Sequence, residues 1–351
     1  MQRIEALRAR LPEGAAALIL TEVNRRYFTG FASSLGYLFL SGERALFYTD
    51  SRYIEAAEKT ASGCEVRLFE RLSDVLRQAV TDLAADRLLA EEEITVSTLR
   101  RLEALAPCPV EADGLSEMVS ALRQIKSAEE VDAIRKAQRI AEAAFDRLLP
   151  QIRPGVSERE LAIELDYTMR RLGAEDLSFE TICVSGENSS MPHGVPGERK
   201  LRPGDFITFD FGAVFGGYHS DMTRTVALGH VDDEMRQVYN TVLQAQEAGL
   251  AVLCPGLPCR EGDLAARSVI EAAGYGRYFG HGTGHSVGLE IHEEPRLSPG
   301  CAVPLEPGMI MTVEPGIYLP GRFGVRIEDM VCVTGDGCEN LTAAPKELLI
   351  L

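Results

Sequence analysis

Residues 201–212 read LRPGDFITFDFG, and residues 305–316 read LEPGMIMTVEPG, so the same pattern recurs 104 positions later. The shared positions are Leu, Pro, Gly, Thr, an acid and a final Gly. The acid is Asp210 in the first copy and Glu314 in the second. A duplicated unit with an acid at the same internal position predicts two half-domains that face each other, with these acids at the seam.

Each copy is followed by a further acid, Asp221 in GYHSDMTRTV and Glu328 in GVRIEDMVCV. The seam would therefore hold four carboxylates. Like charges at close range raise pKa values sharply, so four carboxylates share a small buried volume only when cations are present. The pattern predicts a metal site.

The acids of each copy flank a short glycine-bearing stretch that suits a hairpin turn, AVFGG in the first copy and YLPGRFG in the second. If the first turn centres on Phe215–Gly216, Asp210 and Asp221 lie directly opposite each other, with Cβ atoms about 4.5–5.5 Å apart. The alternative is a set of four surface acids at hairpin edges. Apolar neighbours such as Phe209 and Val313 favour acids inside strands.

The repeat also extends upstream of these segments. IRPGVSERELA at 152–162 resembles LCPGLPCREGDLA at 253–265, which is a shift of 101 positions. Each copy is therefore expected to contain a helix, a Pro-Gly turn, a second helix and a β-hairpin. Two such copies predict an α+β domain with its strands pooled into one sheet and its helices on the outer face.

A fifth metal ligand is expected from the segment GHGTGHSVGLEIHEEP, which contains His281, His285 and His292. The chain has only 6 histidines, so three in one glycine-rich segment indicate function. Glycines allow the backbone to approach a ligand closely. Four acids and one imidazole favour Mn, Fe or Co over a thiolate-type zinc site. Zinc remains an alternative, because imidazole and carboxylate also suit it.

Two divalent ions a few ångströms apart lower the pKa of a bridging water and clamp the attacking and leaving oxygens of a displacement. Histidines outside the coordination shell, such as His193 in MPHGVP and His292, would donate hydrogen bonds to the oxyanion or the leaving amine. The predicted reaction is hydrolysis of an amide or ester.

Composition and charge exclude several classes of function. The chain of 351 residues is long enough for two domains, each with its own core. A net charge of −17 disfavours binding to nucleic acid or anionic lipid. The start MQRIEALRARLPEG lacks the apolar core of a signal peptide, and no apolar run of about 18 residues occurs. With eight scattered cysteines and no CxxC, the sequence predicts a soluble cytoplasmic protein with reduced thiols.

Two domains are expected, residues 1–122 and residues 123–351. The first alternates short apolar runs with helical stretches, which predicts a small α/β domain. Its expected elements are strands 15–20, 37–40 and 45–48 and helices 4–11, 52–59 and 73–85. Near the junction, Ser127 and Glu130 form a capping-box pattern that predicts the start of a long helix.

Taken in order, MPHG, FDFGAVFGGYHSDMTRT, HGTGHSVGLEIHEEP, TVEPGIY and GVRIED resemble the M24 metallopeptidases. This is the pita-bread family of methionine aminopeptidase, aminopeptidase P, prolidase and creatinase. The resemblance spans the second domain and implies a pita-bread fold with an internal pseudo-twofold repeat.

The resemblance also implies a role for each matching residue. It makes five residues the ligands of two divalent ions: Asp210, Asp221, His285, Glu314 and Glu328. Manganese is the expected metal, with Co²⁺, Zn²⁺ or Fe²⁺ as alternatives. Glu314 would also shuttle the proton of a metal-bridging hydroxide. His193 and His292 would bind substrate and stabilise the tetrahedral intermediate.

Further features resemble the proline-specific branch of this family. NRRYFTGF and TDSRY resemble the creatinase-like N-terminal domain of aminopeptidase P and prolidase. His281 precedes His285 by four residues and Arg326 precedes Glu328 by two, as is typical of that branch, so His281 and Arg326 are assigned to substrate binding. The resemblance implies hydrolysis of Xaa-Pro bonds and a homodimer.

Within this branch the expected function is that of an Xaa-Pro aminopeptidase, with the Xaa-Pro dipeptidase (prolidase) as its alternative. The two differ in whether the site leaves room beyond the proline, which the sequence does not specify. Methionine aminopeptidase and a metal-free binding module of the same fold are more distant alternatives. The expected partners are proline-containing peptides or dipeptides, with no nucleic acid and no membrane.

Overall fold

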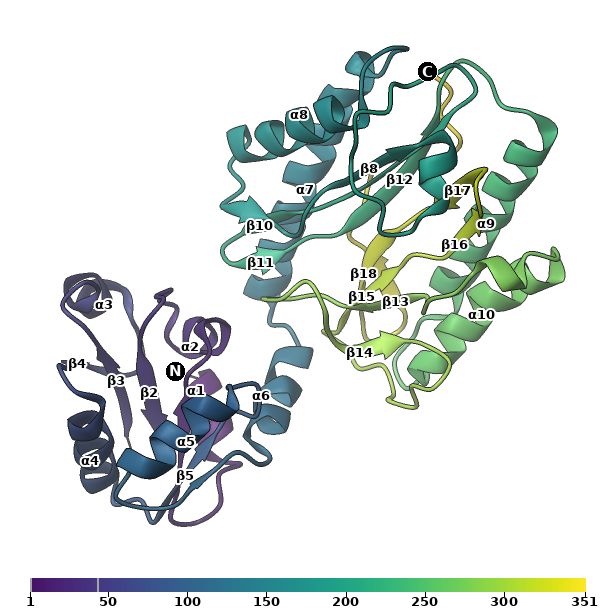
Figure 1. Ribbon diagram of the computed structural model, residues 1–351. Coiled ribbons are helices and arrows are strands. Elements are labelled where there is room, and N and C mark those ends of the chain that lie inside the picture. Colours follow the sequence, from purple (N-terminus) through teal and green to yellow (C-terminus); the bar gives the residue numbers. More distant parts are fainter. Residues whose placement is uncertain (1, 43) are drawn as a thin grey trace. The chain divides into compact units, whose positions relative to one another are not determined.

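The computed structural model describes residues 2–42 and 44–351. Contacts divide the chain into two compact units, an N-terminal unit that ends at Arg123 and a C-terminal unit that begins at Gln124. Both are drawn in Figure 1, with colours that follow the sequence.

The N-terminal unit contains a sheet whose described strands follow the order β4-β3-β2-β1-β5-β6. These strands are β1 (Ala15–Ile19), β2 (Tyr37–Leu40), β3 (Ala45–Thr49), β4 (Glu65–Leu68), β5 (Arg87–Ala90) and β6 (Val110–Glu111). The helices are α1 (Gln2–Arg8), α2 (Glu22–Thr29), α3 (Ile54–Thr60), α4 (Leu72–Leu83), α5 (Val96–Leu105) and α6 (Leu115–Gln124). β1 pairs in parallel with β5 and antiparallel with β2, so the sheet is mixed.

Strands buried on both faces are expected to be continuous apolar runs, and β1 and β3 are buried along their whole length. Their side chains join the helices in one core that includes Leu18, Phe39, Leu46, Leu76 and Leu88. The three predicted strands are confirmed to within one residue, and the three predicted helices to within three residues at each end.

The C-terminal unit has four long helices among its described residues: α7 (Ala128–Leu148), α8 (Glu158–Arg171), α9 (Asp233–Val252) and α10 (Cys259–Ala272). The strands of its first half are β7 (Asp176–Leu177), β8 (Ile182–Ser185), β9 (Phe206–Phe211), β10 (Ala213–Phe215), β11 (Tyr218–His219) and β12 (Met222–Ala227). Those of its second half are β13 (Gly284–Ser286), β14 (Glu293–Leu297), β15 (Ile310–Val313), β16 (Gly316–Leu319), β17 (Phe323–Arg326), β18 (Asp329–Val333) and β19 (Cys338–Asn340). The predicted capping box of Ser127 and Glu130 begins α7.

The internal repeat predicted from the sequence is present in the backbone. β9 and β15 begin 104 positions apart, and α8 and α10 begin 101 positions apart. Each of these elements follows a Pro-Gly turn whose glycine has a positive φ that only glycine adopts readily. Gly204 and Gly308 have φ of 90° and 91°, and Gly155 and Gly256 have φ of 89° and 82°. Each half is thus a pair of helices followed by strands.

The expectation of one pooled sheet is wrong. The described strands instead form the sheets β12-β9-β8, β14-β13-β15-β18-β19, β11-β10-β7 and β16-β17. Pro315 separates β15 from β16, because proline has no N–H to donate to a ladder. At Gly212, between β9 and β10, a Cβ would lie 1.9 Å from the carbonyl oxygen of Ser220, so the chain crosses closely there.

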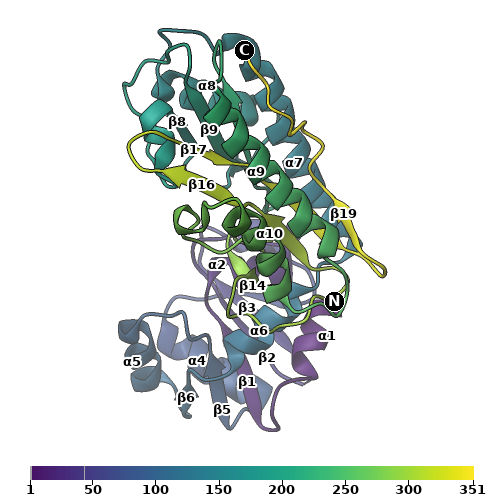
Figure 2. The same cartoon turned by 90° about the vertical axis from the view of Figure 1, so that its right-hand side faces the viewer.

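The helix pair of the first half packs on strands of its own half, whereas the second pair packs on strands of both halves. Phe145 and Leu165 of α7 and α8 share a core with Phe209. Val242 and Ile270 of α9 and α10 share another core with β9, β16 and β17. Figure 2 shows α9 and α10 on the side that faces the viewer. The helices therefore cover the strands from outside and leave the acid-bearing strand ends at the centre of the unit.

Among the described residues, every helix is too short or too polar to span a lipid bilayer.

Candidate metal centre and active site

Asp210 lies in β9 and Asp221 directly precedes β12, which pairs antiparallel with β9. The register places Thr223 opposite Asp210, so the expectation that Asp221 opposes it directly is wrong. The hairpin turns at Gly216–Gly217 rather than at Phe215–Gly216, because both glycines have positive φ (61° and 82°), as a two-residue type I′ turn requires. Asp221 and Thr223 lie two residues apart, so their side chains point to the same face of the sheet, and this is also the face of Asp210.

Glu314 and Glu328 lie at the ends of the β15–β18 ladder, one residue beyond the pair Val313 and Asp329. Continuing that register places the two glutamates opposite each other. Glu328 is also tied to the first half of the unit. Its N–H donates to the Thr223 carbonyl at 3.1 Å, and the Thr223 hydroxyl donates to its Oε2 at 2.8 Å. The acids of the two halves therefore meet at Thr223.

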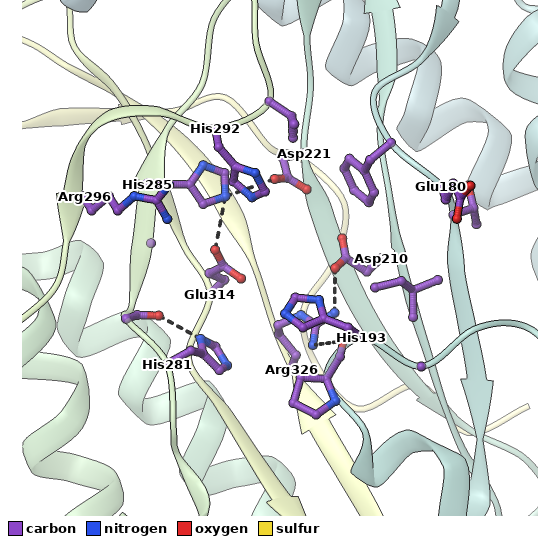
Figure 3. Close-up of a pocket in the computed structure, with 18 of the residues that line it drawn as sticks. Glu180, His193, Asp210, Asp221, His281, His285, His292, Arg296, Glu314 and Arg326 are labelled. Atoms are coloured by element: carbon purple, nitrogen blue, oxygen red, sulfur yellow. Dashed lines mark hydrogen bonds and ion pairs between the residues drawn. The ribbon is translucent and has the colours of Figure 1, made fainter. Parts of the chain in front are cut away.

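His285 lies in β13, between β14 and β15. Its Nδ1 lies 3.1 Å from the carbonyl oxygen of Ser286 and carries a proton, so Nε2 is the nitrogen that would face a cation. Nε2 faces Glu314 Oε1 at 3.3 Å and Asp221 Oδ2 at 3.5 Å, as Figure 3 shows. The ring of His292 packs on that of His285 with centroids 4.5 Å apart. His285 therefore lies among the acids with its Nε2 turned toward Glu314 and Asp221.

Three carboxylate oxygens of this cluster are buried without a hydrogen-bond partner among the described residues: Asp210 Oδ1, Asp221 Oδ1 and Glu328 Oε1. Such oxygens are costly to bury unless a cation or a donor compensates them. Asp221, His285 and Glu328 each offer a ligand atom within 4.8 Å of the others. Carboxylate oxygens with one imidazole are a donor set that fits divalent cations.

The pKa shifts of the acids also indicate a site for divalent cations. Burial raises the pKa of Asp221 well above its ordinary value, and the charges of Asp210 and Glu314 raise it further. Burial and the charge of Asp221 likewise raise the pKa of Glu328. Burial also acts to raise the pKa of Glu314, but the hydrogen bond and charge of His285 outweigh it and lower that pKa to about 2. Bound cations would relieve this repulsion.

A cavity of about 560 Å³ opens beside the acids. His193, His281 and His292, all expected to contact substrate, lie on its walls with Arg326 (Figure 3). Burial lowers the pKa of His281 and of His292, so both are neutral at pH 7 and each carries one ring N–H, which His281 donates to the Gly282 carbonyl. The volume suits a small ligand.

Arg326 is buried, and its guanidinium is bonded within the protein. Nη2 donates to Asp210 Oδ2 at 2.6 Å, and Nε donates to the Thr223 hydroxyl at 3.0 Å. Nη1 donates to the Tyr318 hydroxyl at 2.9 Å, which lies 2.9 Å from His281 Nε2. The geometry therefore gives Arg326 a role in orienting Asp210, beside the substrate contact expected from the sequence.

The sequence did not single out two residues of the cavity region. Tyr318 links Arg326 to His281, but a tyrosine inside an apolar strand gives the signal of an ordinary core residue. Arg296 in β14 lines the cavity with His292, and its side chain is 51% exposed. An arginine at that exposure resembles any solvent-facing strand residue in sequence.

Comparisons with known proteins agree with this geometry. The chain matches the model of Metallopeptidase family M24 over residues 132–335 and that of the Creatinase/Prolidase N-terminal domain over residues 3–125. A Xaa-Pro dipeptidase of Pyrococcus furiosus is 36% identical over 354 residues, which cover 99% of each chain.

Solved structures are similar over nearly the whole chain. A Xaa-Pro dipeptidase from Bacillus anthracis has a TM-score of 0.97 at 44% identity, covering 100% of this chain and 99% of that chain. An X-Pro aminopeptidase from Thermotoga maritima has a TM-score of 0.92 at 38% identity, covering 98% of this chain and 99% of that chain.

These matches confirm the resemblance seen in the motifs and the expected pair of a creatinase-like N-terminal domain and a pita-bread domain. The M24 model alone covers more than half of the chain, and the cluster at its centre fits divalent cations. The chain belongs to metallopeptidase family M24 and is a metal-dependent peptidase.

Proposed function

We propose that this chain is an Xaa-Pro dipeptidase that holds two divalent metal ions, with manganese preferred. The proposed ligands are Asp210, Asp221, His285, Glu314 and Glu328. The dipeptidase replaces the aminopeptidase that the sequence favoured, because the similar proteins named as dipeptidases support it better.

In the structure, Arg296 is the residue that supports the choice of dipeptidase. The proline of an Xaa-Pro dipeptide ends in a free carboxylate, whereas in a longer peptide the same carbon belongs to an amide. A guanidinium pairs with a carboxylate through two parallel charge-assisted hydrogen bonds, which an amide does not match. Arg296 lines the cavity beside His292, where it would bind that carboxylate.

The mechanism assigns proton transfer to Glu314. When bound, divalent ions supply Lewis-acid activation of water and of the scissile carbonyl. Glu314 lines the cavity and faces His285, so it would take the proton of the attacking water. It would then deliver that proton to the proline nitrogen, which leaves as an amine.

The histidines of the cavity would bind and orient the substrate. His193 and His292 would donate hydrogen bonds to the carbonyl oxygen as negative charge develops on it. His281 has both ring nitrogens bonded within the protein, Nδ1 to the Gly282 carbonyl at 2.8 Å and Nε2 to the Tyr318 hydroxyl at 2.9 Å, so it would contact the substrate through its ring rather than through a free N–H.

A second candidate is the Xaa-Pro aminopeptidase. The similarity to the X-Pro aminopeptidase from Thermotoga maritima favours it. A homodimer also remains a prediction, and sedimentation velocity of the purified chain would test it.

Substrate length separates the two candidates. The metal-stripped chain, reloaded with Mn²⁺, should hydrolyse Ala-Pro and leave Ala-Pro-Ala and Met-Ala-Ala nearly untouched. Equal hydrolysis of Ala-Pro and Ala-Pro-Ala would favour the aminopeptidase. Preferential hydrolysis of Met-Ala-Ala would reject both.

The variant Arg296→Gln tests the carboxylate contact. Loss of a charge-assisted hydrogen bond of about 1.5–3 kcal/mol should raise the KM for Ala-Pro roughly 10–100-fold and narrow the preference over Ala-Pro-Ala. Arg170 is a matched control, because its side chain is also 51% exposed and paired with an acid, Asp176. Arg170→Gln should leave KM unchanged. An unchanged KM in Arg296→Gln would remove this residue from the site.

A further inference from the structure

Arg224 in β12 is buried, with its side chain only 2% exposed, and uses its full hydrogen-bonding capacity. The guanidinium has five N–H donors. They reach five oxygens: Nε to the Pro345 carbonyl, Nη1 to the carbonyls of Thr223 and Glu328, and Nη2 to Asp329 Oδ1 and the Ala344 carbonyl. A fully satisfied buried arginine defines the relative position of every segment that it bonds.

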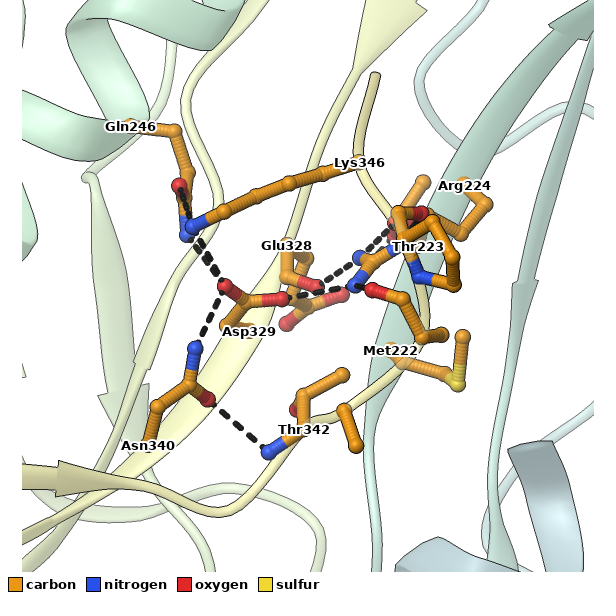
Figure 4. A network of polar contacts seen from close by, with 12 residues as sticks. Met222, Thr223, Arg224, Gln246, Glu328, Asp329, Asn340, Thr342 and Lys346 are labelled. Atoms are coloured by element: carbon orange, nitrogen blue, oxygen red, sulfur yellow. Dashed lines mark hydrogen bonds and ion pairs between the residues drawn. The ribbon is translucent and has the colours of Figure 1, made fainter. Parts of the chain in front are cut away.

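Asp329 is the ionic partner of Arg224 and is equally buried. Its Oδ1 accepts from Arg224 at 2.8 Å. Its Oδ2 accepts from Gln246 at 3.0 Å, Asn340 at 2.9 Å and Lys346 at 2.8 Å. Figure 4 shows these side chains converging on Asp329. The two cations balance the charge of a carboxylate that lies next to Glu328 in sequence.

The C-terminal segment 344–351 is the third part of this network. Arg224 bonds two of its carbonyls, and Lys346 reaches back to Asp329. The Tyr239 hydroxyl donates to the Lys346 carbonyl at 2.9 Å. Farther along, the Ala227 N–H donates to the Leu349 carbonyl and the Leu351 N–H donates to the Ala227 carbonyl, both at 2.9 Å, which lays the segment parallel to β12.

The network lies directly behind the proposed metal ligands. Successive side chains of a strand point to opposite faces, so Asp329 turns to Arg224 while Glu328 turns to the acids. Arg224 bonds the backbone carbonyls of both Thr223 and Glu328, which are the two residues whose side chains are joined at 2.8 Å. Displacing Arg224 would therefore move the Glu328 carboxylate.

We propose that Arg224 is a positioning residue of the metal centre, with Asp329 as its anchor and segment 344–351 as its support. This inference rests on the proposed function, because it takes Glu328 as a metal ligand. According to this inference, the metal centre depends on a buried ion pair and on segment 344–351 as well as on the residues that bind the metal. Groups that orient metal ligands typically change metal affinity about 10–100-fold when they are altered.

Two variants of different severity test it. Arg224→Lys keeps the charge but replaces a five-donor fork by one nitrogen. Lys346→Met removes a partly exposed cation at the edge of the network and is the milder change. Arg199→Lys is the control, because Arg199 forms another largely buried pair, with Asp205, and its described partners include no proposed ligand.

The measurements are the Kd for Mn²⁺ by titration calorimetry of the metal-stripped full chain, its unfolding temperature, and KM for Ala-Pro at saturating Mn²⁺. Arg224→Lys should weaken Mn²⁺ binding roughly 10–100-fold and Lys346→Met by about 2–5-fold, with KM unchanged. Arg199→Lys should lower the unfolding temperature and keep the wild-type Kd.

A wild-type Kd in both Arg224→Lys and Lys346→Met would overturn the inference and leave Arg224 a role in stability alone. If Arg224→Lys fails to fold, the Kd of Lys346→Met for Mn²⁺ tests the inference alone, and a wild-type value would overturn it. The Kd needs no turnover, so a wild-type chain that binds Mn²⁺ but does not cleave Ala-Pro would reject the proposed function and still test Arg224.

Discussion

Replacing Asp221 by asparagine should stabilise the metal-free protein, although it removes a residue on which activity is expected to depend. Asp221 is 4% exposed, and its Oδ1 has no hydrogen-bond partner in the described part of the chain. Its ligand oxygen lies within 4.8 Å of one from Glu328. At that distance and an effective dielectric constant near 20, two like charges repel by about 3 kcal/mol.

The pKa of Asp221 gives the sign of the pH dependence. Burial raises this pKa well above its ordinary value, so the folded state binds more protons than the unfolded state. Stability of the metal-free protein should therefore fall as pH rises from the unfolded pKa, about 3.9, through the folded pKa. Because protonation relieves part of the repulsion, we expect Asp221→Asn to raise the free energy of unfolding of the metal-free protein by roughly 1–2 kcal/mol at pH 8 and by less at pH 4.

Calorimetric unfolding of EDTA-stripped protein at pH 8, with and without Mn²⁺, measures this. A gain of 1–2 kcal/mol should raise the transition of the C-terminal unit by about 2–8 °C. Added Mn²⁺ should stabilise the wild type by mass action and reverse the order. Asp263→Asn is the control, because Asp263 is just as buried but is bonded to Arg267 and Thr283. It should destabilise by roughly 3 kcal/mol. If metal-free Asp221→Asn unfolds as early as Asp263→Asn, the repulsion argument is wrong.

Three further predictions concern other parts of the C-terminal unit. His285→Ala should abolish Mn²⁺-dependent hydrolysis and weaken Mn²⁺ binding in calorimetry, and a wild-type Kd would contradict its role as a ligand. Lys126 pairs with Glu293 at 3.1 Å in a buried site, so Lys126→Met should lower the free energy of unfolding in urea by about 3 kcal/mol. The double variant Lys126→Met with Glu293→Gln should lose less, because it leaves no unpaired buried charge. Equal losses in the two variants would argue against the pair. Arg199 lowers the pKa of the half-exposed Glu187 to about 2. Glu187→Gln should therefore lower the free energy of unfolding by about 0.5 kcal/mol at pH 7. Urea midpoints should show this difference shrinking below pH 4.5 and vanishing near pH 2.

Much of the fold could be predicted because local signals agreed with the tertiary structure. The Pro-Gly pairs at Gly204 and Gly308 specify the same positive-φ turn, so the repeat in sequence became a repeat in backbone. Ser127 predicted the start of α7 because a capping box satisfies the helix N-terminus with neighbouring residues alone. Four acids between apolar residues likewise predicted a buried charged cluster before any fold was known.

The remaining features depend on contacts that no local pattern encodes. A turn at Phe215–Gly216 and one at Gly216–Gly217 both fit AVFGG, and this shift of one position placed Thr223 opposite Asp210. The pooled sheet failed because Pro315 and the close approach at Gly212 interrupt the ladders. Arg224 gave no sequence signal either, because a charged residue in a strand is usually solvent-exposed and its five acceptors come from distant segments.

The central claim is that five side chains from both halves of the repeat hold a pair of divalent ions. A crystal of the full chain grown with Mn²⁺, measured by anomalous scattering at the manganese absorption edge, tests it most directly. The account predicts two neighbouring peaks enclosed by Asp210, Asp221, His285, Glu314 and Glu328. Manganese bound elsewhere, with these side chains paired only to one another, would contradict it.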